Sequence, residues 1–578
     1  MTVEIAGPSP ERPRDVSAEG NRIVHTALRR RWRPLVGGTM LATTHQASEA
    51  LVPVLIGVVI DRAIRTGDGG AMLLWTVSVA GLFVVLATAG LLGYYLLERA
   101  GLLITHDVRQ AVTGRVLDPR GGAGGRTGEV MSLASSDADG VGEAAFAVGL
   151  TIAALPALAF SGVILLSSST QLGLVVLIGL PVVIGLVAVL TRPLVRRAEE
   201  EQDAVAGAAG VITDLVHGLR VLKGIGAEAA AAERYRVSSR AALTARLRSA
   251  RFLGGYETAT FAISGAFLVV VAWVGGRLAV SGEITIGQLV AAVGLAQFLV
   301  DPLSMLIEAG AQGARVRACA RRVRTFLNQP PGILAPSAPR PVPFDVSVAI
   351  ELDQVSFAGL RSVSLSVDSG SMVGVVADPA TAATLVDVLA RALDPVSGEV
   401  RVFGVAYSAV DLAELRRRVV VARHDAVLFS GTIGEQLSLP GTPGRFAPSD
   451  EPSLLASTAL AEVVDAVPGG LDAVVGDAGR ALSGGQRQRV LLARAVAVGA
   501  DVLVVHDPTT AVDASTEASI ADGLRDLRRG ATTIVIASSP TLLARCDRVV
   551  MFGDGGIVAD GTHATLVTDS QYAAMVLT

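Results

Sequence analysis

The sequence predicts two parts, an all-α membrane domain of six helices followed by a cytosolic α/β domain. Three observations lead to this prediction. The 578-residue chain is 51% hydrophobic with a mean hydropathy of +0.53, which is more apolar than soluble proteins usually are. The longest runs without a charged side chain all end by Val300. From about Val346, short apolar runs alternate with helical patterns, which is typical of a mostly parallel sheet.

The six predicted spans are helices, because lipid offers no hydrogen-bond partner to an open backbone. The first span, Pro34–Ile60, is apolar apart from His45 and Glu49. One uncharged run, Ala144–Thr191, is long enough for two spans of roughly 20 residues. The remaining spans are also uncharged: Ala71–Leu97, Thr258–Gly276 and Ile284–Val300.

Arginines predict the orientation of these spans, because basic residues stay on the cytosolic side. Arginines precede the first span and follow the fourth and the sixth, at positions 29–33, 192–197 and 315–322. Arg62 and Arg65 oppose the rule but are outnumbered. Both termini are therefore predicted to be cytosolic. The N-terminus up to about Asn21 lacks the apolar core of a signal peptide.

The domain boundaries follow from composition. The membrane domain is predicted at residues 1–328, with polar cytosolic stretches at about 98–140 and 192–250. A Pro-rich linker at 329–345 leads to the α/β domain at 346–578. The net charge of -4 gives no reason to expect a general affinity for nucleic acid, and no nucleic-acid partner is predicted. Cys319 and Cys546 are too far apart in sequence to suggest a disulfide framework or a zinc site, and no metal site is predicted.

One motif in the last third carries the strongest functional signal. Leu482, Ser483, Gly484, Gly485 and Gln486 form the sequence LSGGQ at the start of a predicted helix. The serine caps that helix, and the two glycines let another molecule approach the backbone. Free N–H groups and the helix dipole at this position suit a phosphate. An apolar strand and the sequence PTTAVD, which ends at Asp513, follow.

This combination resembles the ATP-binding cassette transporters, and the resemblance covers essentially the whole chain. It implies an exporter-type half-transporter (type IV fold), whose cassette has a RecA-like core and a helical subdomain. It further implies ATP and Mg²⁺ as ligands, with the signature and Asp513 acting on ATP held by the opposite cassette. Segments beginning at Thr127 and Gly218 resemble the cytosolic segments that touch the cassettes in such exporters.

The P-loop of the family is lost in this chain. Such a loop needs two glycines, a lysine for the phosphates and a hydroxyl for magnesium. The matching positions hold Val376, Thr381, Ala382 and Ala383, and the only lysine of the chain is Lys223. The motif is therefore predicted to survive only as a strand–turn–helix.

The other residues through which a cassette acts on its own ATP are also replaced. Gly359 stands where an aromatic ring stacks on adenine, and His424 stands where the family has the Q-loop glutamine. His506 replaces the magnesium-associated aspartate, and Asp507 replaces the catalytic glutamate. Ser538 replaces the switch histidine. No intact catalytic residue is expected in this chain's own site.

An intact signature beside a ruined P-loop predicts a heterodimer. The partner would be a second half-transporter with an intact P-loop, and the complex would be an ATP-driven exporter in a bacterial inner membrane. This chain alone is not expected to be an active ATPase. Alternatives are a non-catalytic regulatory or scaffold subunit, an exporter-fold importer of iron chelates, and a decaying paralogue. The substrate is left open as a small or amphipathic molecule.

Ionisable residues in the predicted spans are candidates for the substrate pathway, because charges in lipid tend to face a cavity or a partner. His45 and Glu49 are four residues apart and share one helix face. Glu257 lies near the start of the fifth span. Asp301 and Glu308 near the end of the sixth span are weaker candidates. The alternative role for all of them is an interhelical hydrogen bond or a position in water.

Overall fold

The computed structural model describes residues 13–343, 346–438 and 451–577. The chain forms two compact units. The first holds residues up to Thr113 together with Gly125–Leu327, and the second holds Gly114–Gly124 together with the chain from Asn328 onward. The predicted order of an all-helical membrane domain and an α/β domain is confirmed.

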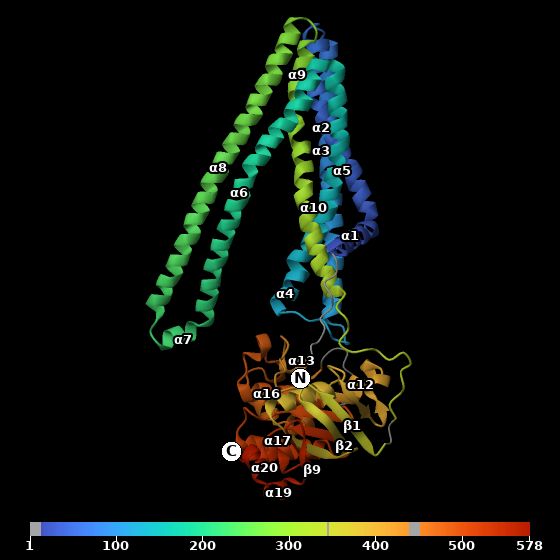
Figure 1. Cartoon of the computed structure of the whole chain (residues 1–578), viewed down its shortest axis with the longest axis vertical. Helices are drawn as coiled ribbons and strands as arrows, with labels where there is room; N and C mark the ends of the chain where they lie inside the picture. The colour runs from blue at the N-terminus through green and yellow to red at the C-terminus, as the bar shows by residue number, and fades with distance from the viewer. Residues whose placement is uncertain (1–12, 344–345, 439–450, 578) are drawn as a thin grey trace. The chain divides into compact units, whose positions relative to one another are not determined.

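The described part of the first unit is entirely helical (Figure 1). Its long helices are α1 (Pro13–Arg30), α2 (Trp32–Val59), α3 (Gly69–Val116), α5 (Ala138–Ser168), α6 (Thr170–His217), α8 (Glu228–Val280), α9 (Ile286–Phe298) and α10 (Val300–Leu327). Five described segments are long and apolar enough to cross a membrane, with α9 and α10 counted as one. The helix α2 is not among them, because His45, Gln46 and Glu49 interrupt its apolar sequence.

The helices α6 and α8 form a hairpin that separates from the other helices of the unit toward α7 (Leu219–Gly224) (Figure 1). They pack mainly against each other. Large apolar side chains along the hairpin stay exposed, including Ile178, Val189 and Phe261, the last at 82%. Exposed apolar surface of this extent marks contact with lipid or with another protein.

The cytosolic segments singled out in the sequence are short helices. Thr127–Ser132 forms α4, which continues through the π-helical turn η2 (Leu133–Asp137) into α5. Gly218 precedes α7 at the turn between α6 and α8. Their contact with a cassette stays a prediction.

The end of α3 and the loop after it pack against the linker. Arg115 donates from Nη2 to the carbonyls of Gln329 and Pro330 at 3.0 and 3.1 Å. The side chain of Gln329 accepts from the N–H of Gly124 at 2.9 Å. These contacts are why residues 114–124 group with the second unit, which the sequence pattern did not predict.

Replacing Gly122 with alanine is expected to break this contact. Gly122 has φ of +76°, and a Cβ there would lie 2.4 Å from both the Pro330 carbonyl oxygen and the Gly332 nitrogen. Strain of this kind costs about 1–3 kcal/mol. Limited proteolysis of the full chain measures the effect, and we expect faster cleavage near residue 330 in Gly122→Ala. The control is Gly124→Ala, because a Cβ at Gly124 meets open space.

The described part of the second unit contains two sheets. The larger has six strands in the order β10-β9-β3-β8-β7-β6, and all neighbours except β10 and β9 are parallel. Its strands are β3 (Met372–Val376), β6 (Val419–Ala422), β7 (Val502–His506), β8 (Thr532–Ile536), β9 (Arg548–Gly553) and β10 (Gly556–Gly561). The smaller sheet is antiparallel, in the order β2-β1-β4-β5, and contains β1 (Val348–Phe357), β2 (Leu360–Asp368), β4 (Ser397–Val402) and β5 (Val405–Ala406).

Helices pack on the parallel sheet because its strands are apolar on both faces. Every residue of β3, β7 and β8 is buried. The helix α11 (Pro379–Leu389) packs on one side through Leu385 and Val386, in the core shared with the smaller sheet. The helices α16 (Gly484–Ala497) and α17 (Ala514–Leu527) contribute to a second core. The ends of these strands and helices hold the candidate site.

Candidate nucleotide site of the cassette

The signature begins α16 with a reciprocal cap. The Ser483 hydroxyl accepts from the N–H of Gln486 at 3.3 Å, and the Gln486 side chain accepts from the N–H of Ser483 at 2.9 Å. Ser483 and Gly484 are exposed, whereas Leu482 is buried and anchors the turn. The N–H groups of Gly484 and Gly485 make no hydrogen bond to the described residues, as expected for a first helical turn. This helix start therefore offers free donors to an anion.

The segment before α17 is fastened to the signature helix. Gln488 donates from Nε2 to the Thr510 hydroxyl at 2.6 Å, and its Oε1 accepts from the N–H of Ala511 at 2.8 Å. A Cβ at Gly485 would lie 2.6 Å from the Ala511 carbonyl oxygen, so glycine is needed for this approach. Gln488 is a positioning residue that the sequence analysis did not identify.

Asp513, predicted to reach across the dimer, caps α17 in this structure. Its carboxylate accepts from the N–H groups and the hydroxyls of Ser515 and Thr516, at 2.6 to 3.1 Å. These hydrogen bonds, that of the Ser515 hydroxyl first, hold the pKa of Asp513 well below its usual range. The side chain therefore serves its own helix and is ionised at neutral pH.

The degenerate P-loop is a very short connection between strand and helix. The strand β3 ends at Val376 and α11 begins at Pro379, so only Ala377 and Asp378 lie between them. Asp378 Oδ1 accepts from the N–H groups of Ala380 and Thr381 at 3.0 and 3.1 Å. These are first-turn donors of the kind that bind phosphate in a P-loop. In this chain, the negatively charged Asp378 side chain accepts hydrogen bonds from both of these N–H groups.

The remaining P-loop positions do not fit ATP with Mg²⁺. Ala382, at the lysine position, is 4% exposed and packs in the core with Leu385. Thr381 is buried as well, and Ala383 offers no hydroxyl to a metal ion. These positions therefore lack the cation and the hydroxyl with which a P-loop holds phosphate and Mg²⁺.

Replacing Asp378 with alanine is expected to lower the stability of the cassette by about 1 kcal/mol through loss of the cap. Hydrogen bonding to Thr381, by its side chain and then its N–H, lowers the pKa of Asp378. The stability from ionisation is thus complete above the unfolded pKa of about 3.9 and is lost as pH falls through the lower folded value.

The measurement is the Tm of the purified full chain between pH 3 and 7. Asp378→Asn is the control, because asparagine also caps helices. We expect its Tm to approach that of the wild type at the acid end of this range. A Tm for Asp378→Ala equal to that of the wild type at pH 7 would contradict the role of the cap.

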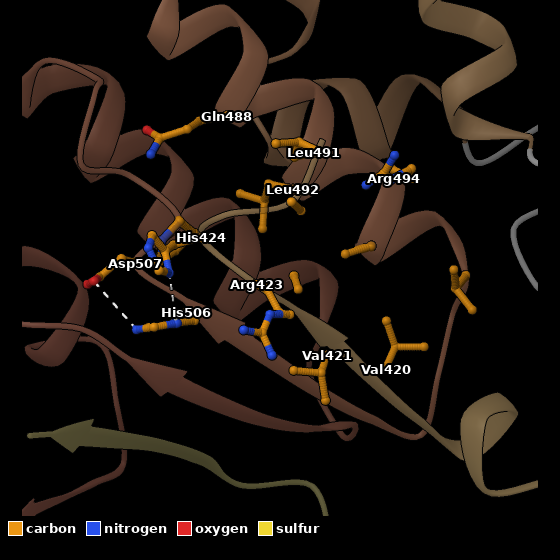
Figure 2. Close-up of a pocket in the computed structure, with 15 residues that line it drawn as sticks. Val420, Val421, Arg423, His424, Gln488, Leu491, Leu492, Arg494, His506 and Asp507 are labelled. Carbon is orange, nitrogen blue, oxygen red and sulfur yellow. Dashed lines mark hydrogen bonds and ion pairs between the residues drawn. The ribbon is translucent and has the colours of Figure 1, made fainter. Parts of the chain in front are cut away.

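Two histidines meet where the family has a glutamine and an aspartate (Figure 2). The strands β6 and β7 are parallel neighbours, so the residues at their carboxyl ends lie side by side. The Nδ1 atoms of His424 and His506 are 3.3 Å apart, and their rings meet edge to face at 77°. One Nδ1 must donate and the other accept. The pair therefore joins the carboxyl ends of β6 and β7.

Burial, more than any neighbouring charge, lowers the pKa of His506, which is 6% exposed. The ring is neutral at pH 7 and cannot replace the charge of an aspartate toward Mg²⁺. Asp507 Oδ2 lies 3.7 Å from His506 Nε2. The backbone of Asp507 is in the left-handed region, with φ of +45°. Asp507 is one of the residues that line a cavity of about 240 Å³, whose surface is mostly apolar.

The sheet order brings most of the predicted positions to one edge. Ser538, Asp507 and His424 follow the neighbouring strands β8, β7 and β6, and Asp378, which was not among the predicted positions, follows the adjacent β3. Ser538 is exposed and has no imidazole to offer. Gly359 turns between β1 and β2 with φ of +112°, and no aromatic ring occupies this position. Asp378 was missed in the sequence, although Asp before Pro is a helix-start signal.

The membrane candidates do not form one cluster. His45 Nδ1 lies 2.9 Å from the Leu86 carbonyl oxygen of α3, and its Nε2 lies 3.9 Å from Glu49 Oε2. The centroids of the Tyr94 and His45 rings are 6.1 Å apart, and the rings meet edge to face. Glu257 is exposed on α8, whereas His45 and Glu49 lie on α2. For His45, the structure shows the interhelical hydrogen bond considered as the alternative role.

Comparison with known proteins agrees with this architecture. Residues 35–303 match the family model of the ABC transporter transmembrane region, and residues 360–510 match the model of the ABC transporter cassette. The chain is 29% identical over 571 residues to an ATP-dependent lipid A-core flippase of Dechloromonas aromatica, covering 95% of this chain and 96% of the relative.

A second relative and a solved structure extend the comparison. A multidrug efflux ATP-binding/permease protein of Mycobacterium bovis is 31% identical over 561 residues, which cover 94% of this chain but 46% of that longer protein. The structure of a bacterial Atm1-family ABC exporter with ATP bound aligns with a TM-score of 0.73 at 22% identity, over 95% of this chain and 98% of that one. The chain belongs to the ATP-binding cassette transporters and has the half-transporter fold of their exporters, with one membrane region and one cassette.

Proposed function

We propose that this chain is the degenerate-site subunit of a heterodimeric exporter, and that it supplies Ser483–Gln486 to an ATP site whose P-loop belongs to the partner. The single observation that carries the proposal is the contrast between two helix starts. The start of α16 is exposed and has free N–H donors. The start of α11 has its donors taken by Asp378.

The losses support an unequal pair of sites. A cassette that holds its own nucleotide needs a cation at position 382 and a carboxylate at position 506, and this chain has a buried alanine and a neutral histidine there. If two copies of this chain formed a dimer, both sites would carry these losses. A partner with intact residues would give one complete site, which uses the signature of this chain.

The membrane unit supports a dimer. The exposed apolar faces of the α6–α8 hairpin find too few partners within the described unit, and a second subunit would cover part of them. The proposed location is a bacterial inner membrane with both termini in the cytosol. We propose a lipid-like or amphipathic substrate, because relatives are named for lipid A-core transfer and multidrug efflux.

The test is ATP binding and hydrolysis in lipid nanodiscs by the chain alone and by its complex with a half-transporter that has an intact P-loop. Photolabelling with azido-ATP locates the bound nucleotide. We expect hydrolysis only in the complex, with the label on the partner. Labelling of residues near Asp378, or Mg²⁺-dependent hydrolysis by this chain alone, would overturn the proposal. Hydrolysis that persists when the partner's P-loop lysine is replaced by alanine would do so too.

A further inference from the structure

A crevice in the membrane unit lies between α1, α5 and α10. Its volume is about 440 Å³, within the range of small-molecule sites. Figure 1 shows α1 beside the lower parts of α5 and α10, and α1 packs against both. The crevice is separate from the cassette, and the proposed function does not use it.

Small residues on two antiparallel helices create this space. Ala147 on α5 and Ala309 and Gly313 on α10 line it. Just below, the two helices touch, because a Cβ at Gly140 would lie 2.7 Å from Cys319 Sγ. Since α5 and α10 run in opposite directions, residues above Gly140 face residues before Cys319. The helices are thus held together at one end and leave a gap one to three turns above it.

The crevice has an apolar end and a basic end. Ile152, which is 49% exposed, opens the upper end beside Ala309. Arg317 and His25 lie at the lower end, and neither makes an ion pair or hydrogen bond with the described residues. The Arg317 guanidinium bends back along its helix, because Nη1 lies 3.3 Å from where a Cβ of Gly313 would be. Its charge therefore faces the gap.

The position of the crevice along the membrane helices indicates that its ligand has both an apolar and a charged part. Ala144, at the lower end, begins the uncharged span of α5, whereas Arg317 belongs to the basic end of α10. The crevice therefore crosses the expected boundary between lipid tails and headgroups. The helix α1 is amphipathic, as are helices that lie on a membrane surface, and Val24 and Leu28 line the crevice one turn apart.

We propose that this crevice binds an anionic phospholipid of the cytosolic leaflet. One acyl chain lies between α5 and α10 beside Ala147 and Ile152. The phosphate lies at Arg317, whose guanidinium can donate two hydrogen bonds to it. His25 adds a third donor at the same end. A bound lipid of this kind fixes α1 against the two helices and fills space that the side chains leave open.

The experiment uses the full chain in nanodiscs that contain a trace of phosphatidylglycerol with a diazirine on one acyl chain. A phosphatidylcholine probe with the same acyl chain tests the charge. Labelled peptides are identified by mass spectrometry. We expect labelling of residues 144–152 and 309–317, at least about fivefold stronger with phosphatidylglycerol, because one basic residue near a membrane contributes about this factor.

Two variants sharpen the test. Arg317→Gln should lower phosphatidylglycerol labelling about fivefold, and the matched control Arg321→Gln should not, because Arg321 lies on the same helix but not in the crevice. Ala147→Leu should lower labelling by both probes by filling the gap. Equal labelling by the two lipids, or labelling that Arg317→Gln and Ala147→Leu leave unchanged, would overturn the proposal. The readout requires no ATPase activity, so failure of the proposed heterodimer would leave it intact.

Discussion

Replacing Ser483 with arginine is expected to lower the ATPase activity of the proposed heterodimeric complex by at least about 100-fold, the scale of losing a preorganised donor to a reacting phosphate. Ser483 is exposed at the start of α16, beside the unpaired N–H groups of Gly484 and Gly485. An arginine side chain fills the space through which a phosphate reaches those donors. Its positive charge also opposes the helix dipole.

Two further variants of this chain, Asp507→Asn and Ser483→Ala, serve as controls for Ser483→Arg. Asp507→Asn removes the carboxylate at the position of the family's catalytic glutamate and is expected to change the activity by less than about twofold. Ser483→Ala removes the cap, worth about 1 kcal/mol, without adding bulk, and so measures the structural share of the effect. ATPase assays of the three purified complexes, with subunit stoichiometry checked, provide the measurement. If Asp507→Asn lowered activity as strongly as Ser483→Arg, this chain's own site would be the working one.

Local patterns were enough to predict the elements that are continuous in sequence. Charge-free runs identified the long membrane helices, and the motif LSGGQ located the start of α16. The antiparallel sheet was not predicted, because β1 pairs with β4 across the intervening β3 and α11. The packing of residues 114–124 with the linker was likewise not predicted, because it joins Arg115 to a residue 214 positions later.

The candidate site shows the same limit. The sequence showed which family residues are missing but not what fills their places. The contact between His424 and His506 spans 82 positions and depends on β6 and β7 being neighbours. The role of Asp378 depends on a connection of two residues between β3 and α11, and its length followed only from the structure. The sequence motif shows that the P-loop glycines and lysine are absent. Only the fold shows that the Asp378 carboxylate accepts hydrogen bonds from the N–H groups at the start of α11.

Restoring the lysine alone is expected to destabilise the cassette rather than to repair its nucleotide site. Ala382 lies on the face of α11 that packs into the apolar core and is 4% exposed, and an unpaired charge there costs about 3–5 kcal/mol. That is a large fraction of the stability of a typical domain. The matched control is Ala383→Lys, at the next residue, which is only partly buried and should cost less than about 1 kcal/mol, because the long side chain reaches water.

The Tm of the cassette transition in the full chain and ATP binding at saturating Mg²⁺ measure the outcome. We expect a Tm lowered by several degrees in Ala382→Lys and no ATP affinity in either variant. An Ala382→Lys chain with wild-type Tm that binds ATP would mean that the loop opens to admit nucleotide. The α11 start would then be a dormant P-loop. The expected result means instead that Ala382 serves as a core residue of α11, which leaves no room for the lysine of a P-loop. It agrees with the proposal that this chain contacts nucleotide through the signature at Ser483.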